Sequence, residues 1–118
     1  MAYNNRKIGE HKEKVAAKYL QSLGYEVLEY NYRYRQGEID LICKEGEFLV
    51  FCEVKYRNSL RNGFPEEAVT YTKQRTISRC ASHYLLTHGF ADIPCRFDVI
   101  SIVGSEIRVL RNAFDFIT

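Results

Sequence analysis

Long apolar runs are missing from this sequence: at no point do eighteen apolar residues follow one another. A membrane-spanning helix needs about that many, so none is expected. The first segment, 1–14, is polar and charged and contains no apolar stretch of the kind that a secretory signal requires. Internal repeats and low-complexity segments are also missing. We therefore expect a cytoplasmic protein without membrane contact.

Paired cysteines are missing as well. The four cysteines are widely spaced and form no C-x-x-C motif: Cys43, Cys52, Cys80 and Cys95. Most of them lie in apolar stretches, which favours buried free thiols. A zinc site that combines them with His11, His83 or His88 would lack the usual ligand spacing, and we do not expect one.

A strong charge bias is absent too, since the formal net charge is +2 and the pI is near 8.3. This mildly basic balance permits a polyanionic partner but does not require one. What is present is the composition of an ordinary globular protein, with 46% hydrophobic and 27% charged residues. We expect a single domain spanning residues 1–118, long enough to bury a core.

Hydrophobic periodicity predicts an α/β protein with the order αβββαββ. A long helix that precedes a strand is the crossover that parallel pairing needs, so we expect a mixed sheet flanked by helices. Glycine follows each predicted helix, and Thr70 is the expected cap of the second. The expected helices span 8–23 and 70–89, and the expected strands span 25–31, 38–43, 48–55, 96–103 and 106–111.

The strands 38–43 and 48–55 are joined by a short connection with glycine and should form a hairpin. If Glu45 and Gly46 form the turn, antiparallel pairing places these residues opposite one another: Lys44 and Glu47, Asp40 and Phe51, Glu38 and Glu53. Alternation along the strands then divides the side chains between two faces. One face carries Glu38, Asp40, Glu53 and Lys55, and the other carries Ile39, Leu41, Val50, Cys52 and Val54. Asp40 and Glu53 become diagonal neighbours that a shared cation can span.

Carboxylates gathered beside apolar strand residues are costly unless a positive charge lies among them. Mg²⁺ or Mn²⁺ suits the oxygens of Asp40, Glu53 and Glu38 as metal ligands. Such an ion activates water against a phosphodiester, and Lys55 is placed to stabilise the charge of the transition state. Taken one strand at a time, an exposed charge pair or the polar position of an edge strand explains the same residues. Their occurrence in register across one short turn favours a metal site.

The first predicted helix offers a further acid. Glu13 borders its apolar stripe and is the better candidate, whereas Glu10 points almost directly away. A glutamate near a helix N-terminus is also explained by the helix dipole.

Basic and aromatic residues flank the hairpin motif and indicate a nucleic-acid surface. Tyr34 or Tyr56 is placed to stack on a base, and the arginines and lysine to contact phosphates. A solvated face with snorkelling side chains is the alternative for each. The candidate nucleic-acid-binding residues are Arg33, Arg35, Tyr56, Arg57, Arg61, Lys73 and Arg75.

Several motifs of the sequence resemble those of a known family. The motifs Gly37 to Ile42, Val50 to Arg57 and Arg96 to Ile100, with Ala68-Val69 and Lys73, resemble the YraN family of small bacterial predicted nucleases. That family is similar to the restriction-endonuclease-like superfamily and its archaeal Holliday-junction resolvases.

The resemblance implies a restriction-endonuclease-like core and metal-dependent cleavage of DNA, with branched or damaged DNA in repair or recombination as the substrate. It also implies catalytic roles for Asp40, Glu53, Lys55 and Glu13, although Lys12 stands where the family commonly has glycine. A homodimer is suggested by the related resolvases. The competing hypothesis is a non-catalytic nucleic-acid-binding module with a structural cation site; a third is an adaptor that uses an exposed sheet edge.

Overall fold

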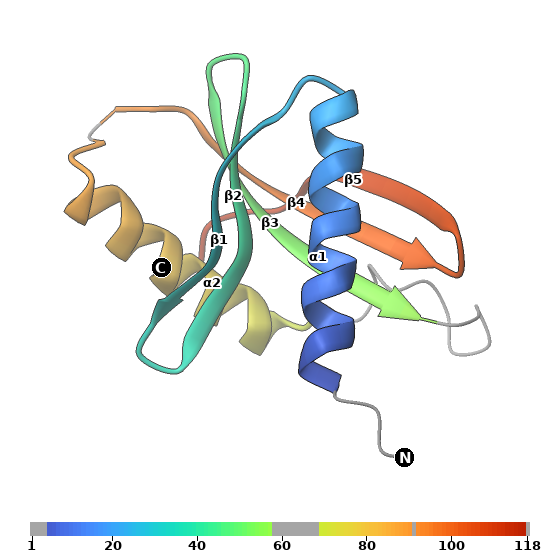
Figure 1. The fold of residues 1–118 in the computed structure, drawn as a ribbon. Helices are drawn as coiled ribbons and strands as arrows, with labels where there is room; N and C mark the ends of the chain where they lie inside the picture. The colour runs from blue at the N-terminus through green and yellow to red at the C-terminus, as the bar shows by residue number, and fades with distance from the viewer. Residues whose placement is uncertain (1–4, 58–68, 91, 118) are drawn as a thin grey trace.

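The computed structural model describes residues 5–57, 69–90 and 92–117, and for residues 5–10 it describes the backbone only. Within these ranges five strands form one sheet in the order β1-β2-β3-β4-β5, with two helices packed on it (Figure 1). The elements are α1 (Asn5–Ser22), β1 (Glu26–Tyr34), β2 (Gly37–Glu45), β3 (Phe48–Arg57), α2 (Tyr71–Thr87), β4 (Cys95–Val103) and β5 (Glu106–Phe114).

The sheet is mixed. The pairs β1–β2, β2–β3 and β4–β5 are antiparallel, while β3 and β4 are parallel. The chain between β3 and β4 contains α2, which is the crossover that a parallel pair requires. The predicted α/β class, the element order and the mixed sheet are confirmed.

Each helix covers one face of the sheet, because alternate residues of β3 belong to different core clusters. Val50 and Cys52 pack with Leu20 of α1. Leu49 and Phe51 pack with a second cluster that includes Ile77 of α2. The β2–β3 hairpin therefore lies between the two helices, and residues of both helices can reach it.

The ends of several elements differ from the prediction. β1 continues to Tyr34, beyond the predicted end at residue 31, because Tyr32 and Tyr34 pair with Ile39 and Gly37 of β2. Thr70 caps α2 as predicted, with its side chain accepting a hydrogen bond from the N–H of Lys73 at 3.2 Å. The helix ends at Thr87, two residues before the predicted stop at Gly89.

The predicted hairpin register is wrong by two residues. Glu45 pairs with Phe48, so the turn consists of Gly46 and Glu47. The physical reason is that Gly46 has φ +58, and a two-residue hairpin turn favours such a residue at its first position. An even shift preserves the alternation of side chains but moves Asp40 away from Phe51 and Glu38 away from Glu53.

Of the five residues predicted for the apolar face, four are placed correctly and one is not. Leu41, Val50, Cys52 and Val54 share the cluster beneath α1, as predicted, whereas Ile39 lies in the cluster beneath α2. The pairing of β1 with β2 is interrupted between the pairs Tyr30–Leu41 and Tyr32–Ile39, and Asn31 has φ +52 there. The side chains of β2 change face at this interruption, which lies at Asp40.

All four cysteines are free, and Cys43, Cys52 and Cys80 are buried, as expected for structural thiols. No helix in the described part of the chain is long and apolar enough to span a membrane.

Candidate functional site

The pairing of β2 with β3 ends next to two of the predicted acids, Asp40 and Glu53. Leu41 opposite Cys52 is the last pair of the ladder, and Asp40 and Glu53 are the next residues on each strand. The side chain of Asp40 replaces the missing backbone bond, since its Oδ2 accepts a hydrogen bond from the N–H of Val54 at 2.8 Å. The Asp40 carboxylate is therefore held across the hairpin instead of projecting freely from one strand.

Three carboxylates meet at this position. One carboxylate oxygen each from Glu13 of α1 and from Glu38 and Asp40 of β2 lies within 4.8 Å of the other two. We call these three residues the acid cluster. Glu38 and Asp40 were predicted as metal ligands and Glu13 as the acid from the first helix, and the structure brings them together. Oxygens at these separations have the spacing of ligands around one hard cation.

The charge of Asp40 is unfavourable without a cation. Burial raises the pKa of its carboxyl group above 3.8, the charge of Glu53 raises it further, and Glu13 and Glu38 add smaller contributions in the same direction. The hydrogen bond from Val54 opposes these effects. A site that disfavours its own carboxylates in this way is complementary to a positive charge.

Glu53 lies beside the acid cluster with a different set of contacts. Its Oε1 is 3.3 Å from Nζ of Lys55 and 3.8 Å from Nζ of Lys73. Glu53 is only 5% exposed, and its buried Oε2 has no hydrogen-bond partner among the described residues. Burial raises the pKa of Glu53, and the two lysines lower it. A buried acceptor without a donor is costly, so this oxygen is available to a cation or to a donor on a substrate.

The predicted nucleic-acid-binding residues separate into two groups. Arg33 and Lys73 are paired with site acids, because Arg33 Nε is 3.6 Å from Glu38 Oε2 and Lys73 contacts Glu53. Arg35 and Arg75 are exposed and line a groove beside α2.

Further predicted residues lie at the end of β3 or beyond the description. Tyr56 extends from β3, and Nζ of Lys12 lies 4.4 Å from the centroid of its ring. Arg57 is the last residue of β3. Arg61 lies outside the described residues. The side chain of Glu10 does too, so of the two candidate acids of the first helix only the position of Glu13 is known.

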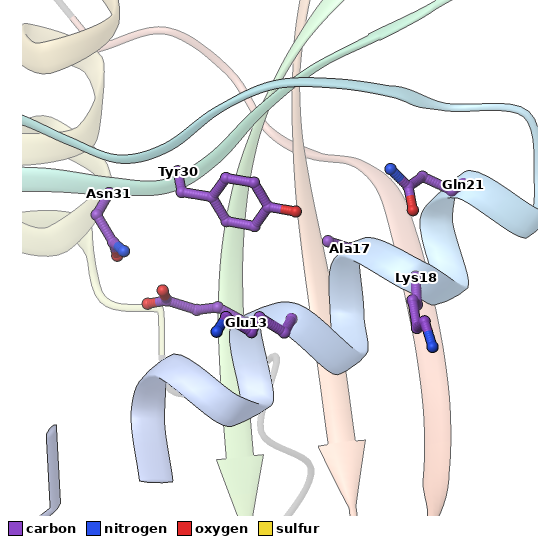
Figure 2. A pocket seen from close by; sticks show the side chains of 7 residues that line it. Glu13, Ala17, Lys18, Gln21, Tyr30 and Asn31 are labelled. Carbon is purple, nitrogen blue, oxygen red and sulfur yellow. The ribbon is translucent and has the colours of Figure 1, made fainter. Parts of the chain in front are cut away.

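A pocket of about 520 Å³ between α1 and β1 adjoins the acid cluster through Glu13. Figure 2 shows the Glu13 carboxylate at one end of this pocket near Asn31, with the ring of Tyr30 above the helix. Ala17 and Lys18 complete the side formed by α1. The pocket leaves open space beside the acid cluster.

Sequence reasoning missed the contact between Lys73 and Glu53. It placed Lys73 on a phosphate, whereas in the structure Nζ of Lys73 lies 3.8 Å from Oε1 of Glu53. The one local signal is Thr70, because a cap at that position fixes Lys73 in the first turn of α2. Its distance from Glu53 depends on the crossover and is not visible in either segment.

A buried polar network was also missed. Asp98 is fully buried, and it accepts hydrogen bonds from the hydroxyl of Tyr25 at 2.7 Å and from Nε of Arg96 at 2.8 Å. Arg96 also contacts Glu45, which accepts a bond from Nη2 of Arg111 at 2.9 Å. An aspartate within an apolar strand was the available signal. Because its hydrogen bonds are satisfied inside the fold, this network is structural.

A mixed sheet with one helix on each face, and a carboxylate cluster where two of its strands separate, defines an α/β protein consistent with a nuclease-like core. The chain belongs to the family described as "Uncharacterised protein family UPF0102", whose model matches residues 12–102. This match confirms the resemblance to the YraN family.

Its relatives carry the same family name over nearly their whole length. A UPF0102 protein of Lachnoclostridium phytofermentans is 50% identical over 94% of this chain and 96% of the relative. A UPF0102 protein of Symbiobacterium thermophilum is 45% identical over 93% of this chain and 98% of the relative. A third, of Caldicellulosiruptor saccharolyticus, is 39% identical over 94% and 99% of the two chains.

Proposed function

We propose that this protein is a metal-dependent nuclease that hydrolyses phosphodiester bonds in DNA. The observation that carries the proposal is the acid cluster together with Glu53, a buried carboxylate that has one oxygen beside two lysines and one without a hydrogen-bond partner among the described residues. A purely structural cation site has no need of an ammonium group beside its acids.

The donor set fits Mg²⁺ or Mn²⁺. Both ions prefer carboxylate oxygens, keep some of their waters and take substrate phosphate as a further ligand. Glu13, Glu38 and Asp40 would hold the ion, with Oε2 of Glu53 as the nearby unsatisfied oxygen. When bound, such an ion supplies Lewis-acid activation of the phosphate and a more acidic water.

The chain's own residues supply the remaining requirements. Lys55 lies beside Glu53, so its ammonium group is held by an ion pair at the place where negative charge develops during attack on phosphorus. Lys73 restrains the same Glu53 oxygen from α2. Asp40 is oriented by the N–H of Val54, which leaves its other oxygen for the cation. The pocket beside Glu13 accepts the part of the substrate that adjoins the cleaved bond.

The family resemblance favours DNA as the substrate, with branched or damaged DNA as the first structures to test. A homodimer is part of the same proposal, because a junction presents two strands for cleavage.

The proposal is tested by incubating purified protein with labelled single-stranded, duplex, flapped and four-way DNA and with matching RNA. Each substrate is combined with Mg²⁺, Mn²⁺ or a chelator. Glu53→Gln and Lys55→Met are expected to reduce the cleavage rate by roughly 10²- to 10³-fold. Glu47→Gln is the matched control, because Glu47 is an exposed acid in the turn of the same hairpin.

Cleavage that survives both site substitutions, or that continues in chelator, would show that another site or a contaminant is responsible. Binding of DNA without cleavage under every condition would instead identify a nucleic-acid-binding module with a structural cation site.

A further inference from the structure

A second cavity, separate from the acid cluster, lies between α2 and the turn that joins β1 to β2. Its volume is about 910 Å³. The charged side chains among its described lining are all basic: Arg35 from the turn, and Arg75 and Arg79 from α2. His83 lies along the same side of the helix, and no described carboxylate lines the cavity. We call this cavity the arginine groove.

No described carboxylate neutralises the arginines of the groove. Arg35, Arg75 and Arg79 are exposed, and none of them forms an ion pair with a described carboxylate. Arg33 and Lys73, which are their neighbours in sequence, are paired with Glu38 and Glu53. In a chain with a formal net charge of only +2, three guanidinium groups around one cavity, with no ion pair to a described carboxylate, form a local concentration of positive charge. The ligand that this charge favours is an anion with several negative groups.

The groove is held in place by close packing of the turn on α2. A Cβ atom on Gly37 would lie 2.5 Å from Sγ of Cys80 and 2.7 Å from Cγ2 of Thr76, so only glycine fits at this contact. The thiol of Cys80 also lies 3.8 Å from the carbonyl oxygen of Tyr34 and donates to it. The position of Arg35 relative to the helix is therefore set by the fold.

Arg35 itself has an unfavourable backbone conformation. Its φ is +55, in the left-handed region, where glycine or asparagine costs less in a two-residue hairpin turn. An arginine at this position gives the fold no conformational advantage. What it supplies is a guanidinium group at the mouth of the groove.

We propose that the arginine groove binds the sugar–phosphate backbone of the nucleic acid next to the cleaved bond. The inference rests on the proposed function for the identity of the anion. Gly37, which lines the groove, directly precedes Glu38 of the acid cluster, and the lining contributed by α2 runs from Arg75 to Leu86. From Arg75 to Leu86 the helix rises about 16 Å, enough for several consecutive phosphates.

The contact is to phosphates and not to bases. One face of the Tyr34 ring is already covered by His83, whose ring is 3.8 Å away between centroids at an interplanar angle of 15°. The guanidinium carbon of Arg35 lies 5.4 Å from the centroid of the same ring. Little of the Tyr34 ring is accessible to a stacking base, so the groove binds nucleic acid without preference for sequence.

The test measures binding of labelled single-stranded and duplex DNA in chelator, so that cleavage does not interfere. The dissociation constant is determined over a series of salt concentrations. Arg75→Ala combined with Arg79→Ala should reduce the magnitude of the slope of log K against log salt by about 1.4 for single strands and about 1.8 for duplex. Lys44→Ala is the matched control, because Lys44 is exposed near the opposite end of β2 and should leave the slope unchanged.

A second variant, Arg35→Asn, tests whether a loss of DNA binding could result from misfolding. Asparagine accepts the left-handed conformation more readily than arginine, so this variant should be at least as stable as the wild type. The magnitude of its slope of log K against log salt should nevertheless be smaller than that of the wild type by about 0.7 for single strands to 0.9 for duplex. Slopes equal to those of the wild type in both groove variants would overturn the inference. It would also be overturned if the wild-type protein bound no DNA at low salt, or if it bound an acidic phosphopeptide and not DNA.

Failure of this inference can be told apart from failure of the nuclease proposal. If the groove variants bind and cleave as the wild type does while Glu53→Gln does not cleave, the groove is wrong and the nuclease proposal stands. If the groove variants lose binding but no metal supports cleavage by the wild type, the groove stands and the chain is a binding module.

Discussion

The carboxyl group of Asp40 is half-buried, and the charges of Glu53, Glu13 and Glu38 act on it, so the stability of the fold depends on its charge. Its folded-state pKa is raised above 3.8, so the unfolded chain releases this proton at a lower pH than the folded chain does. Stability from this group is complete below about pH 4 and is lost as the pH rises toward the folded-state pKa.

Asp40→Asn should therefore stabilise the metal-free protein at pH 7, by on the order of 1 kcal/mol. The amide oxygen can still accept the hydrogen bond from Val54, and no charge has to be buried. Urea unfolding in chelator at pH 7 and at pH 4 measures the effect, which should disappear at the lower pH. A variant less stable than the wild type at pH 7 would show that the charge of Asp40 is already compensated within the chain.

Metal binding should reverse this order of stability. Mg²⁺ or Mn²⁺ at a hundred times its dissociation constant should stabilise the wild type by about 2.7 kcal/mol, because only the folded chain holds the acid cluster together. Asp40→Asn should lose most of this gain. Thermal unfolding with and without each ion provides the measurement, and an equal rise in Tm for both proteins would place the ion elsewhere.

At the scale of the elements, α2 matters because it carries Lys73 to Glu53 and two arginines to the groove. Its first turn is fixed by Thr70, whose hydroxyl accepts a hydrogen bond from the N–H of Lys73. Small changes in this cap therefore alter both the stability of the helix and the position of a site lysine.

Thr70→Ala should destabilise the protein by about 1 kcal/mol, since an N–H at the start of α2 loses its acceptor. Thr72→Ala is the matched control within the same helix, where alanine is the better helix former. Chemical denaturation of both variants distinguishes the cap from a general effect of removing a threonine. Equal stability of the two variants would mean that water replaces the cap without cost.

At the scale of the whole molecule, the network around Asp98 joins parts of the chain that are far apart in sequence. Glu45 at the end of β2 is bonded to Arg111 of β5 and to Arg96 of β4, and Tyr25 precedes β1. Hydrogen bonding to Arg111 is the largest effect on Glu45, and together with the contact to Arg96 it lowers the pKa of Glu45 from 4.5 to about 2. These contacts join the C-terminal end of β2 to β4 and β5.

Because this pKa is depressed in the folded state, Glu45 stabilises the protein above about pH 4.5 and ceases to do so as the pH falls toward 2. Glu45→Gln should cost on the order of 1 kcal/mol at pH 7, allowing for the partial exposure of the side chain, and almost nothing near pH 2. Unfolding curves at the two pH values test this, with Glu47→Gln as the exposed control. A loss of the same size at both pH values would assign the effect to packing.

The acid cluster shows how far sequence reasoning reached. Asp40 and the neighbouring Glu53 were identified because alternation along two adjacent strands is a local property, and an even error in register does not change it. Glu38 lies beyond the change of face at Asp40, so alternation alone does not account for its place in the acid cluster. The error itself came from one residue, since placing Gly46 second in the turn instead of first moves every cross-strand partner by two. The change of face at Asp40 was not predictable, because it accompanies an interruption in the pairing with β1.

The sequence by itself determined the elements, their order and the residue types of the site, because periodicity, turns and caps depend on neighbours along the chain. The tertiary structure decided which charges meet. Arg33 and Lys73 are paired with Glu38 and Glu53, whereas Arg35 and Arg75 form no ion pair with any acid that the structure describes. Nothing in their local sequence separates the two groups. Ion pairing depends on distances of a few ångströms between segments that only the packing of α2 and the sheet brings together.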